Sequence, residues 1–99
     1  MIYRFHLEAE AEHYEAVAFY QSQRAGLGEG YLVEFEQVMA CVVQAPQAFR
    51  VERKPDIRRA HLKRFPHTVI YRELEGAVQI LAIAHKRRRP GYWSGRLSD

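Results

Sequence analysis

The sequence lacks cysteine pairs, long apolar runs and a signal-like N-terminus. Its one cysteine among 99 residues cannot form an intrachain disulfide, so packing alone must stabilise the domain. No apolar run approaches the roughly 20 residues that span a bilayer, which excludes a transmembrane helix. The first ten residues, MIYRFHLEAE, have neither the apolar core nor the cleavage site of a secretory signal. These absences predict one domain, residues 1–99, in the reducing cytoplasm.

Motifs of the common enzyme classes are also missing. The glycine-rich residues 26–30 (GLGEG) follow a helical pattern and lack the Lys and Ser/Thr of a P-loop, so they predict a turn between helices. The five histidines show no HExxH spacing and there is no second cysteine, so we expect no metal and no cofactor. None of the three serines lies in a GxSxG motif.

Charge is abundant but unevenly divided. The net charge is +3, yet residues 1–49 hold two basic and seven acidic side chains, whereas residues 50–99 hold thirteen basic and five acidic ones. This division indicates a dipolar molecule or a basic face built from the second half. Partners of such a face would be nucleic acid, the ribosome or an acidic protein segment. The alternative is a solvated surface whose basic residues serve solubility.

Hydrophobic periodicity in the first half predicts one strand and two helices. Residues 1–7 alternate as in a half-buried strand, and residues 8–25 carry apolar side chains at helical spacing. A second amphipathic helix follows the turn at 26–30 and reaches about residue 45, where Pro46 ends it. Two helices joined by so short a turn should pack as an antiparallel hairpin. Cys41 neighbours the apolar stripe of the second helix and is expected to be a packing residue.

The second half predicts a loop and three strands. Residues 46–56 show no period and form the longest loop, followed by strands at 59–63, 68–73 and 77–84. Residues 77–84 are apolar on both faces, which is typical of a strand inside a sheet. The predicted fold class is α+β in the order β-α-α-β-β-β, with a small antiparallel sheet and the N-terminal helix hairpin packed on one face. The strand order is left open.

The chemically informative residues lie where the last strand meets the tail, residues 85–99. Five cationic or potentially cationic side chains, His85 to Arg89, follow one another, and each like-charged pair at about 4 Å costs roughly 1 kcal/mol in water. His85 is a candidate general base, or a strand-end histidine that bonds a carbonyl. Tyr92 and Trp93 are candidates to stack on bases or to anchor the tail to the core.

Two clusters of basic residues that are far apart in the sequence are expected to lie close together in the fold. In an antiparallel hairpin the exposed side chains of residues 59–64 share a face with the end of the strand 77–85. The alternative for the earlier arginines is pairing with a carboxylate of the same chain. The residues predicted to form one positive binding surface are Arg58, Arg59, Lys63, Arg64, Lys86, Arg87 and Arg88, with Trp93 beside them.

The chain resembles the RelE/ParE superfamily of bacterial toxins from type II toxin–antitoxin systems, along nearly all its residues. The matching features are, in order, Ala9, Glu12, Ala16 and Tyr20; Gly26-Leu27-Gly28; Ala45-Pro46; Ile57-Arg58-Arg59; Leu62 to Pro66; Ile70-Tyr71; His85 to Arg88; and Pro90 to Trp93. The combination is most similar to the ParE-like, plasmid-stabilisation branch. The resemblance implies a β-α-α-β-β-β fold and a cognate antitoxin whose C-terminal segment wraps the toxin. Whether the assembly is a homodimer or a hetero-oligomer with the antitoxin is left open.

The branches of the superfamily imply different targets. ParE-like members are associated with inhibition of DNA gyrase, and this is the reading we adopt. RelE-like members cleave mRNA on the ribosome without a metal, which is the alternative. For that reading the matching catalytic positions are His85, Arg87, Tyr92 and either Lys63 or Arg64, because the chemistry needs cations around a developing negative charge and one proton acceptor.

Overall fold

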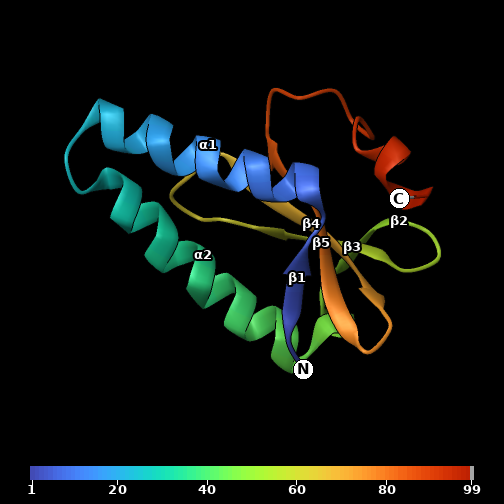
Figure 1. Ribbon diagram of the computed structural model, residues 1–99. Coiled ribbons are helices and arrows are strands. Elements are labelled where there is room, and N and C mark those ends of the chain that lie inside the picture. The colour runs from blue at the N-terminus through green and yellow to red at the C-terminus, as the bar shows by residue number, and fades with distance from the viewer. Residues whose placement is uncertain (99) are drawn as a thin grey trace.

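A five-stranded mixed sheet carries two helices on one face and the C-terminal segment on the other (Figure 1). The computed structural model describes residues 1–98. The elements are β1 (Tyr3–Phe5), α1 (Leu7–Gln23), α2 (Leu27–Gln44), the 3-10 turn η1 (Pro46–Ala48), β2 (Arg50–Arg53), β3 (Ile57–His61), β4 (His67–Leu74), β5 (Ala77–His85) and the 3-10 turn η2 (Ser94–Ser98). Their order in the sheet is β1-β5-β4-β3-β2. The predicted α+β class is confirmed.

Two details of the sheet differ from the prediction. Residues 50–53, expected to lie in a loop, form the edge strand β2, antiparallel to β3. Three of its four side chains are exposed, so this strand has no buried face to produce an alternating pattern, and backbone pairing alone defines it. The sheet is also mixed rather than antiparallel, because β1 runs parallel to β5. Residues so far apart along the chain carry no local signal of their relative direction.

The helix hairpin packs as predicted, with one face of each helix on the sheet. The buried face of α1 repeats at helical spacing through Ala9, His13, Ala16 and Tyr20. In α2 the fully buried side chains include those of Tyr31, Phe35, Met39 and Val42. Leu7, predicted to continue the strand, instead begins α1 and is 78% exposed.

Cys41 corrects another expectation, because its side chain is exposed on α2 rather than packed in the core. The helical stripe around it was read correctly, but a residue beside a stripe faces solvent when nothing covers that side of the helix.

β5 and β4 form the inner part of the sheet and are buried on both faces. Val78 and Ile80 of β5 pack with the helices, whereas Leu81 and Ala82 pack with Trp93 from the tail. Trp93 is 2% exposed. Of the two roles considered for this side chain, anchoring the tail is the one that the structure shows. No helix in residues 1–98 has the length and apolar character needed to cross a membrane.

A side chain of α1 caps the start of α2. Gly26 precedes α2 with φ +88° and offers no side chain for capping. The Gln21 amide oxygen of α1 takes this role and accepts hydrogen bonds from the backbone N–H groups of Gly26 (3.3 Å) and Gly28 (3.2 Å). This arrangement brings the backbones of the two helices close together at Gly28.

Gly28 and Gly30 of α2 are expected to respond oppositely to substitution by alanine. A Cβ on Gly28 would lie 2.8 Å from the carbonyl oxygen of Val17, so Gly28→Ala must push the helices apart and should lower the free energy of unfolding by about 1–2 kcal/mol. A Cβ on Gly30 meets nothing closer than 3.9 Å, so Gly30→Ala should raise it by about 0.5–1 kcal/mol through helix propensity. Urea denaturation of both variants measures the free energy of unfolding. Equal changes in the two variants would show that the helices can move apart at Gly28 without cost.

Candidate functional site

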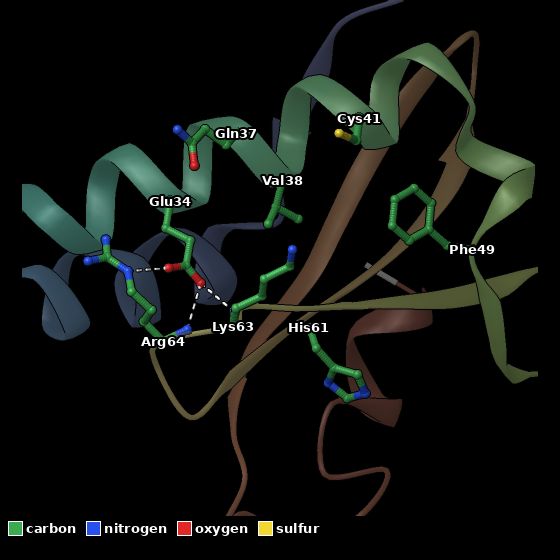
Figure 2. Close-up of a pocket in the computed structure, with 8 residues that line it drawn as sticks. All are labelled: Glu34, Gln37, Val38, Cys41, Phe49, His61, Lys63 and Arg64. Carbon is green, nitrogen blue, oxygen red and sulfur yellow. Dashed lines mark hydrogen bonds and ion pairs between the residues drawn. The ribbon is translucent and has the colours of Figure 1, made fainter.

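A hollow of about 430 Å³ lies between α2 and the segment that leaves β3 (Figure 2). We call it the α2 hollow. Its residues are Glu34, Gln37, Val38, Cys41, Phe49, His61, Lys63 and Arg64. Val38 and Phe49 give it apolar walls, and Lys63 and Arg64 give it a cationic rim. In Figure 2 the Lys63 side chain extends along the hollow toward Val38, whereas the His61 ring points away from α2.

Glu34 fixes the rim of the α2 hollow. Its carboxylate is 6% exposed and accepts hydrogen bonds from the backbone N–H groups of Lys63 and Arg64 and from Arg64 Nε at 3.0 Å. Burial opposes ionisation, but the N–H and guanidinium groups of Arg64 and the N–H of Lys63 together hold the pKa of Glu34 below its ordinary value. The charged carboxylate thus sets the path of the loop after β3 and leaves the Lys63 ammonium without an ion pair among the described residues.

A second, smaller hollow of about 180 Å³ lies where the tail crosses β3 and β4. We call it the tail hollow. The sheet contributes Glu52, Arg59, His61, Thr68, Ile70 and Ala84, and the tail contributes His85, Lys86, Arg88, Arg89, Pro90, Gly91, Tyr92 and Trp93. The one carboxylate in its lining, Glu52, pairs with Arg59 at 2.8 Å. The lining therefore keeps a strong excess of positive charge.

A buried ion pair anchors the tail to α1. The Arg96 guanidinium is 7% exposed and donates to both carboxylate oxygens of Glu12 at 2.9 Å, and to the carbonyl oxygen of Leu81 at 2.9 Å. Glu12 also accepts the Tyr92 hydroxyl (2.8 Å) and the backbone N–H of Ile83 (3.0 Å). Burial works against the charge, but Arg96, Tyr92 and the Ile83 N–H hold the pKa of Glu12 below its ordinary value.

This ion pair also completes the exposed edge of β5. The short strand β1 pairs only with Val78 to Ile80. Beyond that point the Leu81 carbonyl and the Ile83 N–H would lack partners, and Arg96 and Glu12 provide them. The side chains thus replace a missing strand, which explains why charged groups are tolerated at this depth.

The proton-transfer candidates at the tail are engaged in structural hydrogen bonds. His85 Nδ1 accepts from the backbone N–H of Arg87 at 3.1 Å, so in the neutral ring the proton lies on Nε2 and no nitrogen is left to accept another. The Tyr92 hydroxyl donates to Glu12, and burial together with that carboxylate raises the pKa of Tyr92 above its ordinary value. His85 and Tyr92 therefore hold the tail in shape.

Behind His85 lies a second histidine that the sequence did not single out. His67 faces His85 across the β4–β5 pair, with ring centroids 5.2 Å apart, and its Nε2 bonds the Tyr20 hydroxyl at 3.0 Å. Its Nδ1 is buried without a partner. Burial, and then the nearby His85, lower the pKa of His67 to about 4, so its ring is neutral at physiological pH.

The residues of the predicted cationic surface lie in four places. Arg59, Lys86 and Arg88 line the tail hollow, and Trp93 lies beneath it. Lys63 and Arg64 line the α2 hollow instead. The remaining two residues are Arg58, which donates to the Phe49 carbonyl at 2.7 Å and lines a small hollow with Tyr71, and Arg87, which is exposed in the turn after β5.

Alternation along β3 explains the division. Arg58 and Arg59 are neighbours in a strand, so they point to opposite faces of the sheet, and the loop after β3 carries Arg64 toward α2. The residues of the predicted surface therefore line different hollows, which share His61, and Arg59, Lys86 and Arg88 are the ones gathered at the tail hollow. Of the four nuclease positions, Arg64 lines the α2 hollow, and His85 and Tyr92 line the tail hollow.

Three structurally decisive residues were not singled out for these contacts. Glu12 was named only among the features shared with the RelE/ParE superfamily, and nothing local links it to Arg96, 84 positions later. For Glu34 a signal was present, since an acidic residue inside the apolar stripe of α2 needs a buried partner. Within residues 1–98 no group of three His, Cys, Asp or Glu side chains is arranged to hold a metal ion.

Comparison with known proteins finds one matching family model and a similar solved structure. Residues 3–90 match the family model of the ParE toxin of the type II toxin–antitoxin system parDE. Among solved structures, a chain of the chromosomal ParDE TA system from P. aeruginosa is similar with a TM-score of 0.71 and 22% identity, over 86% of this chain and 95% of that one. Among the curated proteins the sequence finds no match.

Proposed function

The chain belongs to the ParE toxin family of type II toxin–antitoxin systems, and we propose that it arrests growth by acting on DNA gyrase in the cytoplasm until its antitoxin occupies the α2 hollow. Membership of the family implies a cognate ParD antitoxin as partner. The gyrase target and the place where the antitoxin binds are the proposed parts.

The α2 hollow is the observation that carries the antitoxin site. A segment that binds there must offer apolar side chains to Val38 and Phe49 and carboxylates to Lys63 and Arg64. An acidic amphipathic segment has this composition. The rim is preorganised, because Glu34 already holds the Lys63 and Arg64 backbone, so binding requires little ordering of the toxin.

The arrangement of the tail supports gyrase over mRNA as the target. A metal-independent ribonuclease needs a free proton acceptor next to cations. The acceptor nitrogen of His85 is already hydrogen-bonded to the backbone N–H of Arg87, and the Tyr92 hydroxyl donates to Glu12. Arg64 lies in a different hollow. Because these groups are already hydrogen-bonded or lie elsewhere, the tail is better suited to contact with a protein target than to cleavage of RNA.

A supercoiling assay tests the target. Added to purified gyrase and relaxed plasmid, the chain is expected to abolish ATP-dependent supercoiling, and prior addition of the cognate antitoxin should restore it. Primer extension on mRNA from induced cells serves as the second measurement. Cuts within codons together with normal supercoiling would contradict the gyrase proposal and favour the ribonuclease.

A further inference from the structure

The turn after β5 concentrates positive charge, most of which no described residue neutralises. The four side chains Lys86 to Arg89 are all exposed. Three of them, Lys86, Arg87 and Arg89, make no ion pair or side-chain hydrogen bond with any described residue. By contrast, the buried Arg96 of the same tail is fully paired. The side chains of Lys86, Arg87 and Arg89 therefore add mutual repulsion without an ion pair or side-chain hydrogen bond to a described residue.

Strands β2 and β3 add further cations beside the same turn. Arg53 places its guanidinium 4.6 Å from the centre of the Trp93 ring and reaches Gly91, where an added Cβ would lie 2.8 Å from its Nη2. Arg59 lines the tail hollow and shares it with the single carboxylate of Glu52. Among residues 1–98, six cationic side chains thus lie in or beside the tail hollow, whose lining holds one acidic side chain, Glu52.

The aromatic side chains of the tail are not available to stack on bases. Trp93 is 2% exposed and lies under Arg53. The ring of Tyr92 has the Arg88 guanidinium 3.9 Å and the Arg96 guanidinium 5.1 Å from its centre. Recognition of single strands relies on open aromatic faces, whereas a duplex presents its phosphates outward. The surface is therefore suited to phosphates and not to bases.

We propose that this tail surface, Arg53, Arg59 and Lys86 to Arg89, binds the phosphate backbone of duplex DNA directly and without sequence preference. An acidic amphipathic segment is the less fitting partner, because the lining of the tail hollow exposes less apolar surface than that of the α2 hollow. The proposal goes beyond the action on gyrase, since it requires only the cations of this chain.

Fluorescence anisotropy with a labelled 20-base-pair duplex tests the proposal. The antitoxin-free chain is expected to bind with a Kd in the range of about 1–100 µM at low salt, weakening steeply as KCl rises. The double variant Arg87→Glu/Arg89→Glu should bind at least about 10-fold more weakly, with a salt slope smaller by about 2. Its matched control is Arg4→Glu/Arg24→Glu, which changes the net charge equally at exposed positions outside the tail hollow and should bind nearly as the parent does.

Each outcome decides for or against direct DNA binding. No binding by the parent at 50 mM KCl, or equal weakening by both double variants, would overturn the proposal. So would a tail variant that keeps its DNA affinity and loses affinity for the antitoxin, which would assign the surface to an acidic segment. Gyrase inhibition is measured separately, so DNA binding without inhibition contradicts only the proposed function, and inhibition without DNA binding contradicts only this inference.

Discussion

Glu12→Ala is expected to destabilise the fold by about 3–5 kcal/mol, a large part of the stability of a domain of this size. The substitution leaves the Arg96 guanidinium buried without a carboxylate. It also removes the acceptor of the Tyr92 hydroxyl and of the Ile83 N–H on the open edge of β5. Urea denaturation at pH 7, followed by far-UV circular dichroism, measures the loss.

Glu8→Ala is the matched control for this prediction. Glu8 lies one turn earlier on α1 and approaches the same guanidinium at 3.9 Å, but its side chain is 61% exposed. An exposed ion pair contributes little, so the change should cost less than about 1 kcal/mol. Similar losses in the two variants would show that the buried network around Glu12 does not hold the tail.

A double variant distinguishes the cost of an unpaired buried charge from the loss of the hydrogen bonds that Glu12 makes. Glu12→Leu/Arg96→Met removes both buried ions together, and should be more stable than Glu12→Ala because no unpaired charge remains. If it is less stable, the hydrogen bonds of Glu12 to the β5 edge matter more than the desolvated guanidinium.

Val38→Asp is expected to weaken antitoxin binding by about 100-fold, equivalent to about 2.7 kcal/mol, and to leave the toxic activity in place. Val38 forms an apolar wall of the α2 hollow, and a carboxylate there would meet the apolar and acidic side chains of the incoming segment. Isothermal titration with the antitoxin gives the affinity. In cells, co-expressed antitoxin should no longer rescue growth.

Two further variants keep this prediction decisive. Val38 also packs against the core, so a melting curve must first show that Val38→Asp is folded. Lys63→Glu changes only an unpaired charge on the rim and should weaken binding without unfolding the chain. Ala40→Asp, exposed on α2 outside the hollow, should bind normally. Unchanged affinity in both hollow variants would place the antitoxin elsewhere.

Some parts of the site could be predicted from the sequence and others could not. The run Lys86 to Arg89 is contiguous, so its exposure and repulsion follow directly from the residues. The position of Arg64 in the α2 hollow could not be predicted, because it depends on which way the loop after β3 turns, and Glu34 of α2 decides that. The buried partner of Glu12 lies 84 positions away and leaves no trace in any local pattern.

The sequence by itself determined the helices, the three inner strands and the division of charge between the two halves. Each of these depends on neighbours within a few positions, where spacing and backbone preference act directly. Only the tertiary structure decided the edge strand β2, the parallel pairing of β1 with β5 and the separation of the basic residues into distinct hollows. These features depend on contacts between residues that are distant in the sequence, and such contacts form only when the sheet assembles. Burial then favours arrangements in which each buried charge is paired, because an unpaired buried charge is costly.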